Sequence, residues 1–583
     1  MTPHDPNSGD ELEAFPDADV APRHENADDR AGAAGRRGRT LSRRAFLAGA
    51  AAVPAGLWMD RALAAAGGVR LGGTFLAGRD PGPQAACALP PDVLARIKRG
   101  WDPQRSGQVV IVPHGWNWVS GRISHCTPWH YTADVPMLWY GPGFIKGRGG
   151  VDRFVTCADI APTISKLIRF PFSAPDGTVM TEALKASPPK PKLVVVLVWD
   201  GGGRYVLDLH PQSWPHLKGL IPKGTWFRRA TTGSSPTSTP PVHATMGTGA
   251  FPRTHGVVDT AMRFPDGRVG DSWSRGPGVI RVPTLADQYA KAKGSAARTA
   301  FFATLPWHLG MLGQGARLPG GARHTAALKI NGSTPSSPPH WGMPERLSPY
   351  YRFPSYVNGL PPLRSYWETA DLADGRNDGR WRGHDIGALV GGFNTPARVP
   401  WQTRAIKEVI IQEQLGHHDE PDLLFLNHKI IDEIGHLYYA DSIEMADTIK
   451  VQDRGLADLV AFLDHRLPGQ WVLLLTADHG HTASPGRTGG MAVLENALRR
   501  VVEDRFDSDG DTAALVQAIR PIWLHLNPAE IADNGTKLQN VSTFIAALTA
   551  SRVARADTIR QGHANDQVFD AVFAGSILPH LTC

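Results

Sequence analysis

Three acidic residues come at or shortly after the ends of apolar runs that we predict to be buried strands. The runs and residues are 193–199 with Asp200, 423–427 with Asp432, and 471–476 with Asp478. Open α/β sheets bind ligands beyond the carboxyl ends of their strands, so these carboxylates should meet at one sheet edge. Packing does not readily explain such a cluster. Carboxylates and the imidazole of the adjacent His479 are typical zinc ligands.

Asp432 and His436 are four residues apart in the segment DEIGH. If this segment is helical, both side chains lie on one helix face. Each residue alone has an ordinary structural interpretation, because an aspartate after a strand is often a helix N-cap. A lone histidine is more often hydrogen-bonded than metal-bound. The case for a metal site therefore depends on all of these elements occurring together.

A dense motif follows the first of these runs. Residues 235–249 read SPTSTPPVHATMGTG, and residues 251–256 read FPRTHG. The motif resembles the nucleophile segment of the nucleotide pyrophosphatase/phosphodiesterase and bacterial alkaline phosphatase families, in the alkaline phosphatase superfamily. The shared features are a Thr-x-Pro core, a Thr-Gly turn and a Pro-x-x-His-Gly ending. The resemblance places the family nucleophile on Thr239 and leaves His243 and His255 with structural roles.

The resemblance implies a two-zinc phosphoesterase that acts on a small-molecule phosphate ester through a phosphothreonine intermediate. A threonine hydroxyl is a poor nucleophile at neutral pH, and zinc coordination would lower its pKa. The ligands implied for this ion are Asp200, Thr239, Asp478 and His479. Asp200 matches the family's first metal-binding aspartate, and the other pair matches its adjacent Asp-His element.

The second zinc ion of these families binds a D-x-x-G-H element, which Asp432 and His436 match. Its third ligand is a histidine near the C-terminal end of the family's chains. That histidine precedes a Val-Pro-Leu-Phe-Tyr-Gly-like strand and an Asp-Ile-Ala-Pro-Thr helix. No such run follows residue 479 here, but residues 135–141 read VPMLWYG and residues 159–163 read DIAPT. The order of the family's elements is therefore rotated.

His125 lies eleven residues before Pro136, as the family's ligand does before its Val-Pro, so we expect His125 to be the third ligand. Cys126 stands where the family has a glycine. The alternative histidines are His130, His481 and His563. We interpret the rotated order as a circular permutation in which residues 67–186 complete the phosphatase core that residues 187–583 begin. Permutation is physically tolerable because domain termini tend to lie close together at the surface.

The fold class expected is α/β, with an alkaline-phosphatase-like, mostly parallel central sheet flanked by helices. Apolar runs at 109–112 and 135–140 add further strands, and residues 159–168 and 443–463 have helical periodicity. Residues about 300–400 are rich in Pro, Gly, Trp and Tyr and show weak periodicity. We expect them to form an inserted cap over the site or a surface elaboration.

The region that corresponds to the monoesterases' Lys-x-Arg pair, residues 308–315, lacks such a pair. A dianionic monoester would lose charge-assisted hydrogen bonds there, so a diester is favoured over a monoester. Val242 replaces the asparagine with which the diesterases bind the oxyanion, and Asp259 and Thr260 stand where monoesterases have theirs. The oxyanion donor is therefore unassigned, and a catalytically silent metal-binding protein is an alternative. A sulfatase is disfavoured, because Thr239 does not lie in a C/S-x-P-x-R motif.

Residues 1–66 combine a polar, acidic lead with a twin-arginine signal. Ser42-Arg43-Arg44 precedes a short apolar run at 48–57, and Ala62-Leu63-Ala64 offers a signal-peptidase site. The run is too short for a permanent membrane span. We therefore expect export by the Tat machinery to the periplasm, the cell surface or the medium.

The whole chain of 583 residues carries a formal net charge of +6, without a basic stripe interleaved with aromatic residues. This pattern gives no support for nucleic-acid binding. The four cysteines are Cys87, Cys126, Cys157 and Cys583. Their spacing does not fit a zinc ribbon, and in an exported protein they could form one or two disulfides of unassigned pairing.

Overall fold

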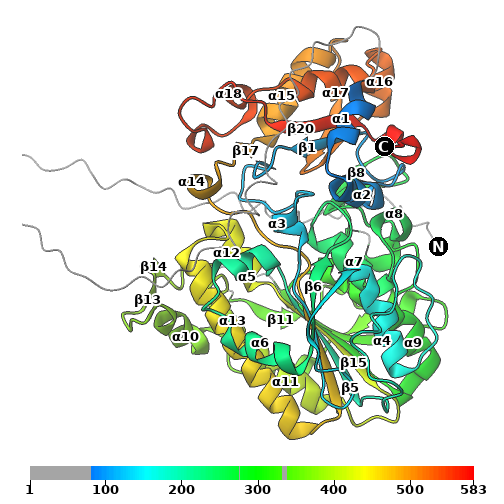
Figure 1. Ribbon diagram of the computed structural model, residues 1–583, viewed down its shortest axis with the longest axis vertical. Helices are drawn as coiled ribbons and strands as arrows, with labels where there is room; N and C mark the ends of the chain where they lie inside the picture. The colour runs from blue at the N-terminus through cyan, green and yellow to red at the C-terminus, as the bar shows by residue number, and fades with distance from the viewer. Residues whose placement is uncertain (1–80, 275, 331–337) are drawn as a thin grey trace, which may run out of the picture. The chain divides into compact units, whose positions relative to one another are not determined.

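The computed structural model describes residues 81–274, 276–330 and 338–583, which belong to one compact unit, Gly72–Cys583 (Figure 1). The lead and export signal predicted at 1–66 lie outside the described residues. None of the helices in the described part of the chain combines the length and the apolar character that a membrane span requires.

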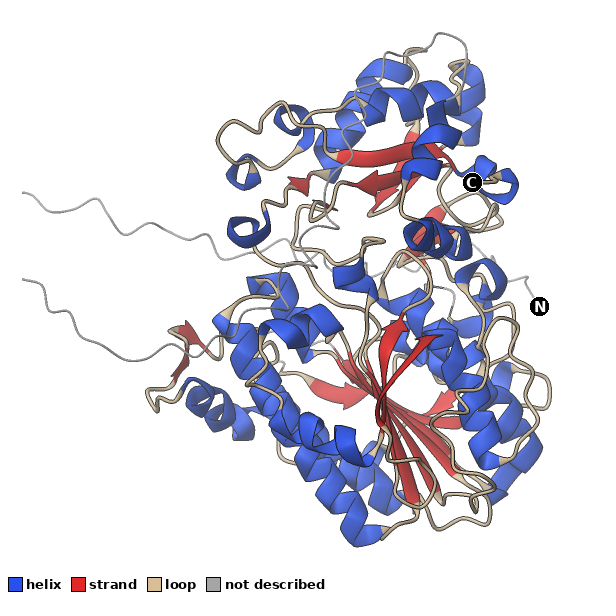
Figure 2. Ribbon diagram, in the orientation of Figure 1, coloured by secondary structure: helices blue, strands red, loops and turns tan. Residues whose placement is uncertain are grey.

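A ten-stranded, mostly parallel sheet lies between two layers of helices, which confirms the predicted α/β fold class (Figure 2). The strand order is β11-β10-β9-β15-β5-β16-β3-β6-β4, and β12 pairs with β10. The bounds are β3 Met137–Tyr140, β4 Gly149–Thr156, β5 Leu193–Trp199, β6 Thr225–Thr231, β9 Thr299–Phe302, β10 His324–Ile330, β11 His340–Gly342, β12 Tyr351–Arg352, β15 Asp422–His428 and β16 Trp471–Thr476. β3 is antiparallel to β16 and β6, and β11 is antiparallel to β10, whereas the other pairs are parallel.

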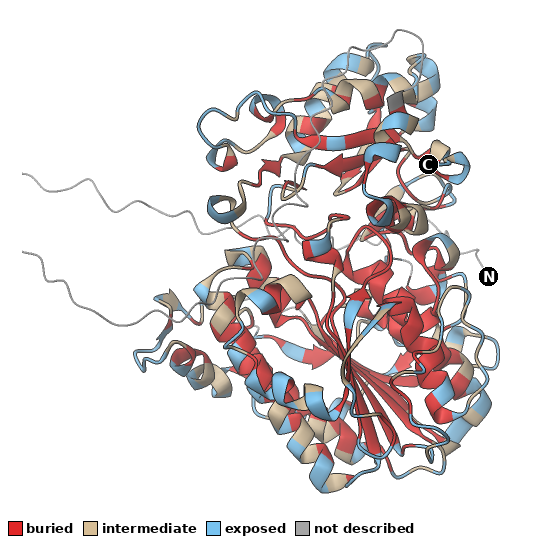
Figure 3. Cartoon of the chain, viewed as in Figure 1, coloured by how far each residue is buried: buried red, intermediate tan, exposed pale blue. Residues whose placement is uncertain are grey.

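The middle strands are apolar along their whole length because helices cover both faces of the sheet (Figure 3). In β5, Val194, Val196 and Val198 pack into one core, and the alternate residues pack into the other. The first core includes α4 (Ile160–Ile168), α7 (Thr239–Thr248) and α9 (Leu285–Lys293). The second includes α5 (Arg204–Leu209), α11 (Arg398–Gln412), α12 (Ile430–Tyr438) and α13 (Ile443–Arg466).

A second sheet, of four antiparallel strands, was not predicted. Its order is β18-β19-β1-β20, with bounds β1 Val109–Pro113, β18 Val516–Arg520, β19 Trp523–Leu526 and β20 Phe569–Ala574. Assigning residues 109–112 to the parallel sheet was therefore wrong. Helix α2 (Pro91–Gly100) lies in the core on one face of β1, and α15 (Glu495–Phe506) and α17 (Leu538–Ala546) lie in the core on the other. Burial on both faces makes β1 as apolar as a parallel strand.

Residues 67–186 contribute to both sheets, through β1 in one and through β3 and β4 in the other. β3 lies next to β16, the strand that leads to Asp478, and Leu138 pairs with Leu475. The N-terminal segment thus supplies strands beside the predicted site. Its origin by circular permutation stays a prediction.

We predicted that an inserted cap occupies residues about 300–400. This start is too early, because β9, β10, β11 and β12 are strands of the central sheet. Trp341 and Trp381 are buried in the core that contains α11 and α13. Within this region the described elements after β12 are mostly short helices and a two-stranded hairpin, and Arg382 pairs with Asp447 of α13 at 2.7 Å. Short elements of this kind explain the weak periodicity.

Cys87 in α1 (Pro81–Ala88) forms a disulfide with Cys583, which links the two ends of the described chain. Cys126 and Cys157 are free and buried. The structure therefore resolves the pairing that spacing could not assign.

Candidate active site

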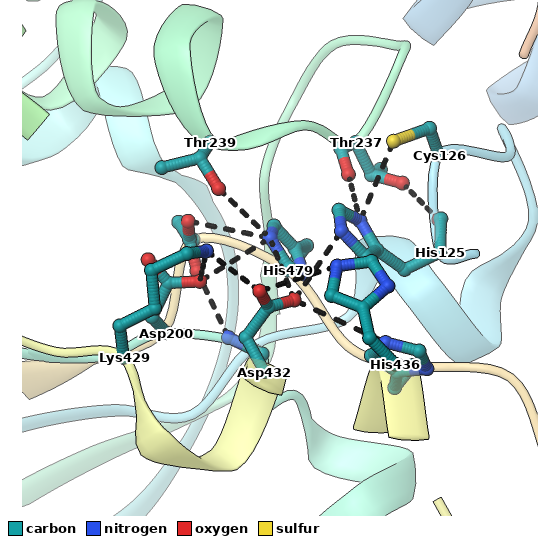
Figure 4. A network of polar contacts seen from close by, with 12 residues as sticks. His125, Cys126, Asp200, Thr237, Thr239, Lys429, Asp432, His436 and His479 are labelled. Atoms are coloured by element: carbon teal, nitrogen blue, oxygen red, sulfur yellow. Dashed lines mark hydrogen bonds and ion pairs between the residues drawn. The ribbon is translucent and has the colours of Figure 1, made fainter. Parts of the chain in front are cut away.

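Asp200, Asp432 and Asp478 come together where β5, β15 and β16 end. Figure 4 shows Asp200 and Asp432 on either side of Lys429 and close to His479. Asp432 lies in the first turn of α12, so the segment DEIGH is helical, which is the condition for Asp432 and His436 to lie on one face. The backbone N–H of Asp432 donates to the carbonyl oxygen of Asp200 at 3.0 Å. Gly201, with φ of 73°, permits this approach, because a Cβ there would lie 2.7 Å from the Asp432 Cα.

The first cluster contains Asp200, Asp478 and His479, each with one ligand atom within 4.8 Å of the others. His479 Nε2 lies 3.6 Å from Asp200 Oδ1 and 3.4 Å from Asp478 Oδ2. Thr239, the first residue of α7, places Oγ1 3.4 Å from the same nitrogen. The structure therefore brings together the four residues predicted around the first ion.

The second cluster contains His125, Asp432, His436 and His481. His125 Nε2 lies 3.3 Å from Asp432 Oδ1, and His436 Nε2 lies 3.3 Å from Asp432 Oδ2. The His125 and His479 rings stack with centroids 3.6 Å apart, so the two clusters are adjacent. The residues predicted around the second ion thus lie together, and His481 joins them.

Three imidazoles are held so that Nε2 faces the carboxylates. In His125, His436 and His479, Nδ1 lies beside a backbone carbonyl oxygen. The acceptors are Thr237, Ile123 and Gly480, at 2.8, 2.6 and 2.9 Å. Because a carbonyl oxygen only accepts, Nδ1 carries the proton, and in the neutral ring Nε2 keeps a lone pair. Burial opposes protonation of His436, but Asp432 raises its pKa above the ordinary value, so a bound metal ion would have to displace a proton from that Nε2. Metal-binding histidines are commonly oriented in this way.

His481 has the opposite arrangement. The backbone N–H of Thr482 donates to His481 Nδ1 at 3.1 Å, so the neutral ring carries its proton on Nε2. That nitrogen lies 3.9 Å from Asp432 Oδ1. A protonated nitrogen has no lone pair for a metal ion, so His125 fits the ligand role better than His481.

The other two alternatives lie in different surroundings. His130 is exposed and pairs with Asp92 at 3.0 Å and with Asp134 at 3.4 Å. His563 pairs with Asp566 at 2.7 Å. Neither histidine belongs to a metal-ligand cluster among the described residues.

Asn427 and His308 both contact Oδ2 of Asp200 and so orient this carboxylate. Asn427 Nδ2 donates to Asp200 Oδ2 at 2.8 Å, and His308 Nε2 lies 3.1 Å from the same oxygen. His243 donates from Nδ1 to the Thr239 carbonyl oxygen at 2.9 Å and lies beside Asn427 through Nε2. Asp200, His243 and His308 also offer ligand atoms within 4.8 Å of one another, so the structural role expected for His243 stays a prediction.

The donor set fits divalent cations. Asp432 Oδ1 and Asp478 Oδ2 are buried and accept no hydrogen bond from any described residue. Burial and the neighbouring Asp200 raise the pKa of Asp478 well above its usual value. Burial also lowers the pKa values of His125 and His479, which keeps both rings neutral and able to bind a metal. Three buried carboxylates with two such orphaned oxygens need more positive charge than the protein supplies.

Lys429 supplies the positive charge that the structure does contain. Its Nζ lies 3.1 Å from Asp200 Oδ1 and 2.6 Å from Asp432 Oδ2, so the ammonium group bridges the two clusters. Burial favours the neutral amine, but Asp200 and Asp432 raise the Lys429 pKa above its ordinary value. The Lys429 side chain is therefore an ammonium cation beside these ionised carboxylates.

A sequence profile describing type I phosphodiesterase / nucleotide pyrophosphatase matches residues 194–571. The chain belongs to this family. It is accordingly a phosphoester hydrolase of the alkaline phosphatase superfamily.

Curated relatives of this phosphodiesterase-family chain are distant. A calcium-transporting ATPase of Myroides odoratus is 26% identical over 415 residues, covering 60% of this chain and 72% of the relative. The alkaline phosphatase PhoV of Synechococcus elongatus is 27% identical over 344 residues, covering 51% of this chain and 60% of the relative.

Solved structures show lower similarity. A crystal structure of the alkaline phosphatase PafA is 17% identical, with a TM-score of 0.45, and the match covers 67% of this chain and 85% of that one. Phosphonoacetate hydrolase from Sinorhizobium meliloti 1021 is 15% identical, with a TM-score of 0.36, over 67% of this chain and 83% of that one.

Sequence reasoning missed three residues that contact the carboxylates of this family member. They are His308, Asn427 and Lys429. Asn427 could have been found, because it lies near the end of β15, beside the other strand ends. His308 lies in a short 3₁₀ helix, Pro306–Met311, and its spacing gives no comparable signal.

Proposed function

We propose that this chain is an exported two-zinc phosphoesterase in which Thr239 is the nucleophile. The observation that carries the proposal is the position of Thr239 Oγ1, 3.4 Å from His479 Nε2 and beside the Asp200 cluster. The residues that would hold one ion are Asp200, Thr239, Asp478 and His479. Those that would hold the other are His125, Asp432 and His436.

Bound zinc would lower the pKa of the Thr239 hydroxyl and neutralise charge on the phosphate group. The chain's own contribution is to fix the nucleophile. Thr239 is 3% exposed and begins α7, where Pro240 and Pro241 restrict φ in the first turn. Thr239 Oγ attacks phosphorus, and one ester oxygen leaves as the alcohol with the proton of the threonine hydroxyl. Water then cleaves the bond between phosphorus and Thr239 Oγ, which restores the hydroxyl and releases a phosphate monoester from a diester substrate or inorganic phosphate from a monoester.

The donor that stabilises the developing negative charge is Lys429 in this proposal. Pro240 and Pro241 have no N–H, so the first turn of α7 offers fewer amide donors than an ordinary helix N-terminus. Val242 is apolar and buried. The Lys429 ammonium lies between Asp200 and Asp432, next to both predicted ions, and can interact with a phosphate oxygen that enters there.

A phosphodiester is the favoured substrate, because residues 308–315 lack the Lys-x-Arg pair that monoesterases use for a dianion. A phosphomonoester is the second candidate. The additional positive charge of Lys429 is the observation that favours it, since a monoester carries more negative charge than a diester.

Export is part of the proposal. The twin-arginine motif at 43–44 supports it, and so does the Cys87–Cys583 disulfide, since structural disulfides persist in oxidising compartments. N-terminal sequencing of the secreted protein should find a start near Ala65. A mature start far from that residue would contradict the cleavage site.

The deciding experiment compares hydrolysis of bis-p-nitrophenyl phosphate and p-nitrophenyl phosphate by zinc-loaded protein. We expect faster diester cleavage, two zinc ions per chain, and loss of activity after chelation. Thr239→Ala should lower kcat at least about 10³-fold while the zinc at the Asp432 cluster is kept. Faster monoester cleavage would favour the second candidate, and no cleavage of either ester would favour a silent metal-binding protein.

A further inference from the structure

An acidic loop in the C-terminal part of the chain brings three carboxylates together outside the catalytic clusters. The loop joins α15 to β18, and its carboxylates face α16 (Pro528–Asp533). One oxygen each of Asp507, Asp509 and Glu530 lies within 4.8 Å of the others. Residues 507–511 read DSDGD, so acidic side chains occur at every second position.

Asn534, directly after α16, ties the loop to the helix. Its Oδ1 accepts from the backbone N–H groups of Ser508 at 2.7 Å and Asp509 at 3.1 Å. Its Nδ2 donates to Asp509 Oδ2 at 2.9 Å. Gly510, with φ of 80°, allows the tight turn between the acidic residues. The Asp509 carboxylate is thus held in place by a contact that does not neutralise its charge.

Glu530 is the observation that points to a ligand. The residue is 3% exposed, and its Oε2 is buried without a hydrogen-bond partner in the described part of the chain. No ion pair between described residues involves Asp507, Asp509 or Glu530. Burial, and then the charges of Asp511 and Asp509, raise the Glu530 pKa. A buried carboxylate that faces two others requires a cation or a proton.

We propose that Asp507, Asp509 and Glu530 bind a calcium ion. All three ligands are carboxylates, which favours a hard cation over zinc. Acidic residues at the first, third and fifth positions are typical of calcium-binding loops, and the loop here has Asp507, Asp509 and Asp511 in those positions.

The site differs from an EF-hand. Thr512 stands at the sixth position, where that motif has glycine, and Ala518 stands at the twelfth, where it has glutamate. Glu530 would supply the missing carboxylate from a separate helix. With three protein ligands in contact range and water at the other positions, we expect an affinity of about 10⁻⁴–10⁻³ M, as in extracellular modules.

The test is a calcium titration of the full-length, zinc-loaded protein by calorimetry, with thermal unfolding measured in parallel. We expect one calcium ion per chain and a Tm increase of about 2 °C at ten times the Kd. Glu530→Gln and Asp509→Asn should each lose calcium binding and the Tm increase. Magnesium should give a smaller increase than calcium, because Mg²⁺ dehydrates reluctantly.

Glu530→Gln should also change the thermal stability in the absence of calcium, because it removes one of three neighbouring negative charges. In calcium-free buffer its Tm should exceed that of the wild type, and in saturating calcium the order should reverse. Glu345→Gln, at an exposed position, is the matched control and should behave as the wild type. A wild type without a calcium response, equal responses to magnesium and calcium, or calcium binding retained in both site variants would overturn the proposal.

Discussion

The Lys429 ammonium lies 2.6 Å from Asp432 Oδ2, and Lys429 also reaches Asp200 across 3.1 Å. One buried cation therefore contacts a carboxylate from each of the two predicted zinc clusters. Two divalent ions and an ammonium group would share these carboxylates. Lys429 should therefore affect both the affinity for zinc and the charge offered to a phosphate group.

Lys429→Met should make zinc binding tighter and catalysis slower. Removing the ammonium leaves two buried carboxylates unpaired, which destabilises the metal-free protein by about 3–5 kcal/mol, and zinc should recover that loss. We expect kcat to fall about 10²–10³-fold, as for loss of an oxyanion donor. Zinc affinity is measured by competition with a chelator, and stability by unfolding with and without zinc.

The control for that variant is Lys407→Met, which removes a partly buried lysine of α11 that pairs with the exposed Asp458 at 2.6 Å. Surface pairs contribute about 0–1 kcal/mol, so it should leave zinc affinity and kcat unchanged. Unchanged zinc affinity together with unchanged kcat in Lys429→Met would show that the ammonium acts on neither.

Because His125 and His481 have opposite arrangements of their ring protons, replacing each of them should have a different effect on zinc binding. His125→Asn removes a nitrogen with a lone pair facing Asp432, so zinc at this cluster should bind at least about 100-fold more weakly. His481→Gln removes a ring whose Nε2 carries the proton, so two tightly held ions should remain. Counting zinc per chain by mass spectrometry after dialysis separates the outcomes, and two ions in His125→Asn with one in His481→Gln would reverse our ligand assignment.

The parts of the site that could be predicted from sequence are those set by local rules. Asp200 and Asp478 follow buried strands, and strand ends meet at one sheet edge whatever the rest of the fold does. Asp432 and His436 share a helix face by spacing alone. His125 required the resemblance to a family, because its distance along the chain from Asp432 gives no local signal.

The parts that could not be predicted depend on contacts between distant segments. Lys429 contacts Asp200 across 229 positions of sequence, and a lysine after a strand ordinarily lies at the surface. β1 pairs with β19 and β20, more than 400 residues later, and its burial on both faces gives the same apolar run as a parallel strand. Local patterns report burial but not the partner strand.

Stability should fall between pH 7 and pH 5, partly because of His525. This histidine in β19 is buried with both ring nitrogens unpartnered among the described residues, and burial lowers its pKa to about 3. The unfolded chain, with a pKa of about 6.5, binds this proton at pH 5 and the folded chain does not, so stability decreases as pH falls. The contribution is about 2 kcal/mol between pH 7 and pH 5.

His525→Phe should remove that contribution, so its free energy of unfolding should change less between pH 7 and pH 5 than that of the wild type. Denaturant unfolding at both pH values measures the difference. His580→Phe, at an exposed position, is the control and should keep the full dependence. Identical pH dependence in His525→Phe and the wild type would contradict the assignment to His525.

The Cys87–Cys583 disulfide should stabilise the protein because it restricts the unfolded chain across a sequence separation of 496. Typical contributions are about 2–4 kcal/mol, so Cys87→Ser and Cys583→Ser should lower the free energy of unfolding by similar amounts. The double variant should lose no more than either single variant, because each already lacks the bond. A reducing agent should lower the Tm of the wild type to that of the variants and leave the variants unchanged, and a reductant effect retained in the double variant would point to a different cysteine pair.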